Sequence, residues 1–279
     1  MERTLGRPEI IIGLIDGPVA MNHPDLNTEN IRELPGKLQG VCTTTRSFAC
    51  IHGTFVAGIL SARRGSSAPA ICPNCTLLVR PIFSESTPSY GEIPSATPQE
   101  LAEAIIDCIN AGTRILNLSA ALTYPSAKGD HELEQALDYA ARRGVIVVAA
   151  TGNQGTLGST VITRHPWVIP VVAYDMHGRP VGFSNLGTSI GQRGLGAPGE
   201  AIPSLGADGK LLTLSGTSAA APFVTGVIAL LCSELPARSV AEVKFVITQS
   251  SRVQRTTVIP PLLDAWSAYQ ILETVGMRR

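Results

Sequence analysis

Three segments of this chain each place one chemically active side chain among small residues. Asp16 ends the run IIIGLID, His52 lies in IHGTFVAG, and Ser218 lies in SGTSAAAP. Nucleophilic acyl transfer requires a hydroxyl, a base that takes its proton, and an anion that orients the base. Each residue alone has an ordinary explanation as a turn residue, a surface residue or a helix cap. Their occurrence together favours a catalytic triad, with Gly53 and Gly216 leaving room for a substrate backbone.

The elements that must hold these residues alternate between strands and helices. Buried apolar runs predict strands, and amphipathic patterns with capping signals predict helices between them. The strands are expected at residues 10–16, 76–83, 113–119, 145–150 and 168–174, and the helices at 98–111 and 130–143. Such alternation implies an α/β fold, with a mostly parallel sheet and helices on both faces. Functional groups then gather beyond the carboxyl ends of the strands, where Asp16 and Asn153 fall.

Beyond residue 175 the pattern changes to Gly-rich segments that are typical of loops and a hairpin. A long apolar helix is expected over about 218–234, and two weaker helical patterns near 239–250 and 264–275 close the chain. No linker, repeat or low-complexity tract interrupts the sequence. Residues 1–279 are therefore expected to form a single domain.

The composition argues against several classes of partner. The chain has 22 Lys and Arg against 22 Asp and Glu, with scattered basic pairs, so we expect no binding of nucleic acid. The longest apolar run, residues 227–232, is far below the roughly 20 residues of a membrane span, so we expect no membrane association. The N-terminus lacks a secretory signal pattern, which predicts a cytoplasmic protein. Nothing in the sequence indicates an oligomeric state.

The six cysteines are Cys42, Cys50, Cys72, Cys75, Cys108 and Cys232. The last two fall in apolar helical patterns and are expected as buried thiols. Cys72 and Cys75 have the C-x-x-C spacing of a metal or redox site, to which the first two cysteines could add ligands. For these four, unpaired thiols are favoured, followed by a local disulfide and then structural zinc.

The three segments resemble the Asp, His and Ser motifs of the subtilisin-like serine proteases, or subtilases, in that chain order. The resemblance covers about residues 8–250 and includes GAPG at 196–199 and GTSAAAP at 216–222. It implies a subtilisin-like fold and endopeptidase activity, with Asp16, His52 and Ser218 as the triad. The segment AATGNQG resembles the one that carries the oxyanion asparagine of the family, which maps to Asn153. Its carboxamide and the Ser218 backbone N–H would then face a tetrahedral intermediate.

Two further segments resemble parts of the family's specificity site. LNLSA at 116–120 resembles the strand that binds the substrate backbone, and HPWV at 165–168 resembles the floor of the specificity pocket. The resemblance implies that substrate is bound by Leu118, Ser119, Ala120, Gly152 and His165.

The chain also departs from the secreted subtilases. Its first strand begins by Ile10, so we expect no N-terminal prodomain within this chain. The segment between residues 61 and 76 is short and poor in carboxylates, so no calcium is expected there, and we predict no metal and no other cofactor. The usual Met after the catalytic serine is Ala219, which removes no catalytic group.

The motifs resemble most those of the leader-cleaving proteases of cyanobactin (patellamide-type) maturation, which implies a precursor peptide as substrate. A sister protease of that pathway joins peptide ends into a macrocycle and carries a capping insertion between its Asp and His motifs. Only 36 positions separate Asp16 from His52, which favours hydrolysis over transamidation. A general cytoplasmic degradative protease is the alternative. A catalytically dead peptide-binding module would lack a triad residue, and none is missing.

We expect removal of divalent cations to leave the stability of the protein unchanged. A metal that binds only the folded state raises the melting temperature by mass action, so stripping it would lower that temperature. The measurement is a thermal melt with and without EDTA. A drop of several degrees that Ca²⁺ reverses would contradict this expectation, and reversal by Zn²⁺ alone would point to Cys72 and Cys75.

Overall fold

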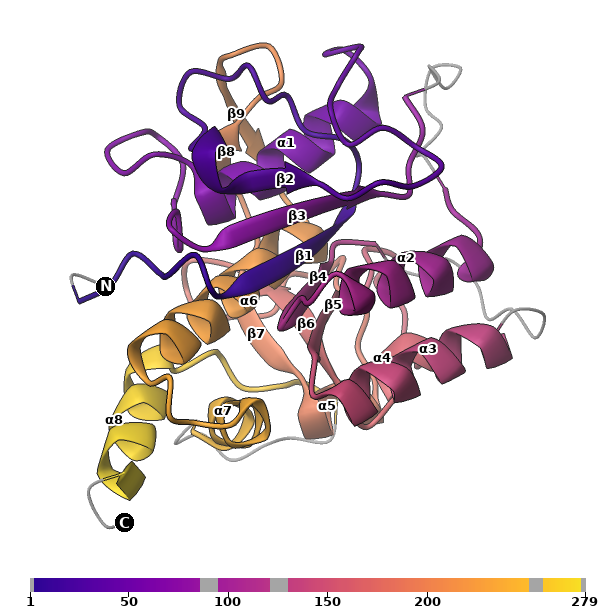
Figure 1. Cartoon of the computed structure of the whole chain (residues 1–279). Helices are drawn as coiled ribbons and strands as arrows, with labels where there is room; N and C mark the ends of the chain where they lie inside the picture. The colour runs from indigo at the N-terminus through magenta and orange to yellow at the C-terminus, as the bar shows by residue number, and fades with distance from the viewer. Residues whose placement is uncertain (1–2, 86–94, 121–129, 251–257, 277–279) are drawn as a thin grey trace.

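A computed structural model describes residues 3–85, 95–120, 130–250 and 258–276. Within them, seven parallel strands form one sheet in the order β2-β3-β1-β4-β5-β6-β7 (Figure 1). These strands are β1 (Ile11–Asp16), β2 (Ile31–Glu33), β3 (Thr76–Pro81), β4 (Ile115–Leu118), β5 (Ile146–Ala150), β6 (Val168–Tyr174) and β7 (Leu195–Pro198). The predicted α/β fold with a mostly parallel sheet is confirmed.

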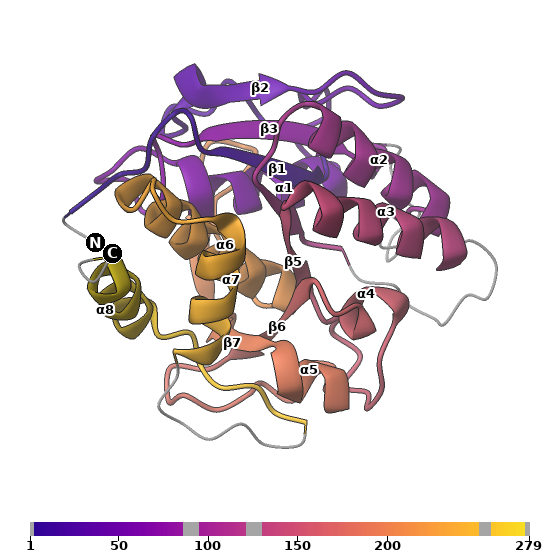
Figure 2. The same cartoon turned by 60° about the horizontal axis from the view of Figure 1, so that its bottom comes forward.

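Helices cover both faces of the sheet, as Figure 2 shows. On one face lie α2 (Pro98–Asn110) and α3 (Asp130–Arg143), and on the other lie α1 (Phe48–Ser61) and α6 (Thr217–Glu234). The remaining helices are η1 (Thr28–Asn30), α4 (Val161–Arg164), α5 (Thr188–Arg193), α7 (Val240–Gln249) and α8 (Ala265–Gly276).

Neighbouring residues of each central strand enter different cores, because side chains alternate between the faces of a sheet. In β5, Ile146 and Val148 pack with α1 and α6, whereas Val147 and Ala149 pack with α2 and α3. All four are fully buried. This explains why the strands read as continuous apolar runs rather than as alternating patterns.

The helix α6 runs through the core beneath the sheet. It is the one described helix that is long and apolar enough, by length and composition alone, to cross a membrane, and 78% of that window is buried inside the protein. The sequence predicted this helix over about 218–234, but the search for a membrane span considered only unbroken apolar runs, and Thr, Ser and Gly interrupt the apolar residues of α6. Its burial accounts for its apolar composition.

A short helix lies within the Gly-rich region that follows residue 175, where the sequence predicted only loops and a hairpin. The six-residue α5 begins at Gly187 without a capping side chain, and it is too short to show a helical period in the sequence. The expected hairpin does form, from the antiparallel strands β8 (Ile202–Leu205) and β9 (Leu211–Leu214).

Two glycines allow α1 to approach the loop that follows β1. A Cβ atom on Gly53 would lie 2.4 Å from the carbonyl oxygens of Gly17 and Pro18, and one on Gly17 would lie 2.0 Å from the carbonyl oxygen of Ala49. The space at Gly53 was predicted to admit a substrate, but the backbone of the protein fills it. The two glycines therefore set the distance between the strand that carries Asp16 and the helix that carries His52.

We expect Gly53→Ala to destabilise the protein by about 1–3 kcal/mol, because the added methyl group would overlap two backbone oxygens. This cost exceeds the gain in helix propensity, which is about 1 kcal/mol. The measurement is the free energy of unfolding in urea. Gly182→Ala is the matched control, since no atom lies within 4 Å of its added Cβ. Equal stability of Gly53→Ala and the unmodified protein would refute the explanation.

Candidate active site

Side chains from β1, α1 and α6 form a continuous hydrogen-bonded chain. Asp16 Oδ1 lies 2.7 Å from His52 Nδ1, and His52 Nε2 lies 3.0 Å from Ser218 Oγ. Asp16 is fully buried and also accepts a hydrogen bond from the Gly17 N–H. An anion at Nδ1 holds the proton of a neutral imidazole on that nitrogen, so Nε2 is free to accept a proton from Ser218. The structure thus brings together the three residues that the sequence singled out.

His52 lies in the second turn of α1. The helix begins at Phe48 because Ser47 caps it, accepting a hydrogen bond from the Cys50 N–H at 3.1 Å. The ring of Phe48 stacks on the imidazole of His52, with 5.9 Å between centroids and 20° between the ring planes. A carboxylate at one edge and an aromatic ring on one face together hold the imidazole in position.

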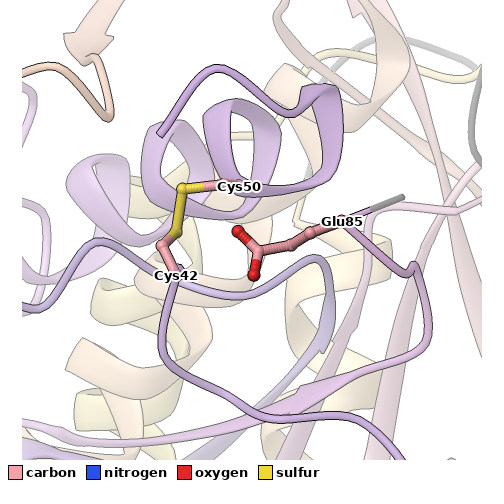
Figure 3. Close-up of side chains that lie close together, drawn as sticks. All are labelled: Cys42, Cys50 and Glu85. Carbon is pink, nitrogen blue, oxygen red and sulfur yellow. A yellow bond between two sulfur atoms is a disulfide. The ribbon is translucent and has the colours of Figure 1, made fainter. Parts of the chain in front are cut away.

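A disulfide joins Cys42 to Cys50 and ties the loop before α1 to the first turn of that helix (Figure 3). The favoured alternative of unpaired thiols is therefore wrong for these two residues. The carboxylate of Glu85 lies beside the disulfide and accepts hydrogen bonds from the N–H groups of Thr43 and Thr44. Cysteines bind metals as thiolates, so the grouping of these two cysteines with Glu85 offers no metal site while the disulfide is intact.

Cys72 and Cys75 are buried free thiols, as are Cys108 and Cys232. Hydrogen bonding to Cys75 and burial raise the pKa of the Cys72 thiol well above its ordinary value. Among the described residues, no third His, Cys, Asp or Glu joins this pair to form a group with the spacing of a metal site. The cysteines at 42 and 50 also belong to a separate grouping, so the four do not assemble a zinc site there.

The N-terminus of α6 carries Ser218 and contains an unusual proline. Pro222 lies in the second turn of the helix. Proline has no N–H, so the carbonyl of Ser218, four residues earlier, receives no helical hydrogen bond from it. The hydroxyl of Ser119 donates to that carbonyl instead, at 3.3 Å. A residue that follows β4 is thus linked directly to the backbone of the candidate nucleophile.

A buried asparagine that the sequence analysis missed extends this link. Asn117 in β4 donates from Nδ2 to Ser119 Oγ at 2.7 Å and accepts from Thr225 Oγ1 at 2.8 Å. Asn117 and Thr225 are fully buried. Asn117 is the one polar residue in the buried apolar run ILNL, and this was the signal that could have identified it.

Asn153 follows β5 and faces the same site. Its carboxamide oxygen accepts hydrogen bonds from the backbone N–H and the hydroxyl of Thr217, at 2.9 and 3.0 Å. These two donors fix the orientation of the amide, so Nδ2 is the group left to act as a donor. A Cβ atom on Gly216 would lie 3.2 Å from that Nδ2 and 3.1 Å from Ser218 Oγ. The carboxamide N–H groups are therefore placed beside the nucleophile, as an oxyanion donor requires.

A cleft of about 550 Å³ opens at Ser218. Of the predicted substrate-binding residues, it contains Ser119, Ala120 and Gly152, together with Asn153. Its apolar wall is formed by residues that no motif identified, namely Phe48, Ile82, Phe83, Ala96, Leu101 and Leu214. Two of these follow the end of β3, where the strand-end rule could have found them.

Two of the predicted substrate-binding residues do not line the cleft. Leu118 is the last residue of β4, and its fully buried side chain packs in the core beneath α2 and α3. His165 is also buried, and its Nε2 lies 3.2 Å from Asp138 Oδ1 in α3. The side chains of Leu118 and His165 therefore do not form the wall of the cleft, and binding of substrate by the backbone of this strand stays a prediction. In each case the side chain is buried in the protein, although Ser119, next to Leu118, lines the cleft.

Burial lowers the pKa of His52, but the charge of Asp16 and the hydrogen bond to it outweigh burial and raise that pKa overall. The neutral form, which can accept a proton from Ser218, therefore predominates only above the raised value.

We expect Asp16→Asn to lower the pKa of His52 below its ordinary value, because burial then acts without a compensating anion. The measurement is an NMR titration of the imidazole, assigned with His52→Gln. Asp25→Asn is the control, since the charge of that carboxylate acts on His23 instead. An unchanged His52 titration in Asp16→Asn would contradict the role given to Asp16.

Comparisons with known proteins agree with this geometry. The subtilase family (peptidase S8) matches residues 7–264. The chain is 31% identical over 246 residues to a thermophilic serine proteinase of Bacillus sp. (strain AK1), covering 86% of this chain and 56% of that protein. It spans about half the length of the first curated relatives that it matches.

Two solved structures are similar over almost the whole chain. A mutant of the protease domain of PatA has a TM-score of 0.89 at 33% identity, with 99% of both chains covered. The prenylagaramide maturation protease PagA has a TM-score of 0.83 at 31% identity, with 97% of this chain and 96% of that chain covered. The sequence match, the shared fold and the hydrogen-bonded Asp, His and Ser lead to one conclusion: this chain belongs to the subtilase family.

Proposed function

We propose that this chain is a serine endopeptidase in which Ser218 attacks the carbonyl carbon of a peptide bond. The observation that carries the proposal is the contact of 3.0 Å between Ser218 Oγ and His52 Nε2. His52 takes the hydroxyl proton as the C–O bond forms, and Asp16 stabilises the resulting imidazolium. The negative charge on the substrate oxygen is met by Asn153 Nδ2 and by the backbone N–H groups at the start of α6.

The second half of the reaction uses the same groups in reverse. His52 gives its proton to the leaving nitrogen as the C–N bond breaks, which leaves an ester between Ser218 and the acyl part of the substrate. A water molecule then loses a proton to His52 and attacks this ester. Collapse of the second tetrahedral intermediate returns the proton to Ser218 and releases a new carboxylate.

The segment between Asp16 and His52 supports hydrolysis as the fate of the ester. Between residues 17 and 47 the chain forms only two regular elements, the three-residue η1 and β2. Both belong to the region of the β2 edge of the sheet, and neither is a helical cap of the length needed to cover Ser218. An amine can capture the ester only where the site excludes water. A site that no such cap covers therefore favours attack by water and linear products.

The proposed substrate is a ribosomal precursor peptide that is cleaved before its core. The support is the similarity to PagA and PatA, which are named as prenylagaramide and patellamide maturation proteases. The mostly apolar wall of the cleft also suits an extended peptide with at least one apolar side chain.

The test is digestion of a leader–core peptide in H₂¹⁸O, followed by mass spectrometry. We expect one dominant cleavage position, a linear product, and the heavy isotope at the new carboxyl terminus. Ser218→Ala should abolish cleavage and fluorophosphonate labelling. Ser215→Ala is the matched control, because Ser215 lines the same cleft and its hydroxyl accepts a hydrogen bond from the Ala201 N–H rather than bonding to His52.

Each contrary outcome of this digestion has a distinct meaning. Labelling that persists in Ser218→Ala would refute the assignment of the nucleophile. Macrocyclic product would refute hydrolysis as the fate of the ester. Rapid and scattered cleavage of casein would favour the degradative alternative over a precursor peptide.

A further inference from the structure

Among the described residues, no strand pairs with the outer backbone edge of β9. The N–H of Gly206 donates to the carbonyl of Lys210 at 2.7 Å, so this pair closes the β8–β9 hairpin as a hydrogen-bonded pair. Bonded and non-bonded pairs alternate along an antiparallel ladder. Leu211 and Thr213 therefore occupy non-bonded positions, and their N–H and C=O groups point away from β8. Pro203, which has no N–H, lies opposite Thr213 and fits this register.

The outer edge of β9 is accessible in the described structure. Leu211 is 54% exposed, and Thr213 is exposed as well. The small sheet consists of β8 and β9, with no further strand among the described residues. An unpaired edge of this kind can add another extended chain through main-chain hydrogen bonds.

This edge is continuous with the candidate active site. Leu214, at the end of β9, lines the cleft that contains Ser218, whereas Leu211 and Leu212 line a second, open pocket of about 860 Å³. The hairpin lies beside α1 (Figure 1). The hydroxyl of Ser204 in β8 donates a hydrogen bond to the carbonyl of Phe55 in α1. From Leu211 to Leu214 the strand spans about 10 Å, at about 3.4 Å per residue.

The chemistry of the reaction places the leaving segment of a substrate on this side. His52 must donate its proton to the leaving nitrogen, so that part of the substrate departs past His52 and α1. The β8–β9 hairpin packs on α1, whereas Ser119 and Ala120 line the cleft from the end of β4. The leaving segment runs away from Ser218 and β9 runs toward it, so the two chains would be antiparallel.

The second pocket contains an unsatisfied donor. His23 is only 5% exposed, and its Nδ1 accepts a hydrogen bond from the Asp25 N–H at 3.0 Å, so the neutral ring carries its proton on Nε2. This Nε2 is buried and has no partner among the described residues. Arg46 and Lys210 also line the pocket, with Asp208 3.9 Å from Lys210. Two cations against one carboxylate give this pocket an excess of positive charge, which suits an acidic group.

We propose that β9 and this second pocket bind the part of the peptide substrate that follows the scissile bond. The leaving segment pairs as an antiparallel strand with the backbone of Thr213 and Leu211, and an acidic side chain farther along occupies the pocket. This inference rests on the proposed endopeptidase function. It defines the substrate class as peptides with an extended segment and a downstream Asp or Glu after the cleavage site.

The first test uses peptides that are identical before the scissile bond and carry two, four, six or eight residues after it. We expect kcat/KM to rise until the segment after the scissile bond is long enough to pair with all four residues of β9, and then to level off. Each added net hydrogen bond should contribute about two- to tenfold. Methylation of single backbone nitrogens in the longest peptide should reduce kcat/KM at every second position, because alternate N–H groups of a strand face its partner.

The second test removes one donor from the protein. Thr213→Pro eliminates an outward N–H but no hydrogen bond to β8, and Thr213→Val is the matched control that keeps this N–H. We expect the proline variant to lower the ratio of kcat/KM between the eight-residue and two-residue peptides by about two- to tenfold. The valine variant should keep that ratio. Thermal melts of both variants show whether the hairpin is intact.

The third test addresses the pocket with peptides that carry Glu, Gln or Lys near the far end of the leaving segment. We expect cleavage to favour Glu over Gln, and the double variant Arg46→Glu, Lys210→Glu to favour Lys instead. The position that responds most strongly identifies the side chain that enters the pocket.

The outcomes separate this inference from the function on which it rests. Absence of cleavage at every peptide length would refute the endopeptidase function. Cleavage that is equally fast at all four lengths would overturn the inference and leave that function intact. A length effect without the alternation, or one that Thr213→Pro does not reduce, would also overturn pairing with β9. Equal cleavage of the Glu and Lys peptides by both forms of the protein would overturn the assignment of the pocket.

Discussion

The position of Ser218 depends on the contact between the start of α6 and the end of β4. Helix α6 lacks one backbone hydrogen bond because Pro222 has no N–H. The hydroxyl of Ser119 donates instead to the carbonyl of Ser218, which would have accepted that bond. Asn117 then links Ser119 to Thr225, one turn further along α6. Buried polar groups are costly unless they are bonded, so this network admits few other arrangements of helix and strand. The nucleophile and one wall of the cleft are consequently fixed by the same set of hydrogen bonds.

His52 and Asp16 are positioned by a different constraint, which is steric. Gly53 and Gly17 bring the backbone of α1 against the loop after β1, so the side chains of His52 and Asp16 meet at 2.7 Å. The disulfide at Cys50 and the cap at Ser47 hold the first turn of the same helix. Rigid supports of this kind allow hydrogen bonds to be oriented before a substrate arrives.

Two buried polar atoms in and near the site have no hydrogen-bond partner among the described residues, which lowers stability. One carboxylate oxygen of Asp16 is buried without a hydrogen-bond partner among the described residues, and so is Nε2 of His23. The first lies in the triad and the second lies in the pocket beyond β9. Such departures from full satisfaction concentrate where a protein binds or transforms other molecules.

Several features followed from the sequence because their signals are local. Strand β5 is a short apolar run that ends at a polar turn, and α2 begins at a capping box on Thr97 that the sequence displays directly. The three triad positions were also identified from short motifs, since each lies at the end of a strand or in the first turns of a helix. The parallel sheet then brings these ends to one edge, which is why the predicted Asp16, His52 and Ser218 meet.

Other features were decided only by the tertiary structure, because they depend on contacts between distant segments or on the direction of a side chain. Spacing could not tell that Cys42 pairs with Cys50 while Cys72 and Cys75 remain thiols. The sequence could place His165 in a motif that resembles one of the family, but it could not show that the ring turns toward Asp138 in the neighbouring helix. The outward edge of β9 exists because the register of the hairpin turns alternate backbone groups away from β8, and register is a property of paired strands rather than of either strand alone.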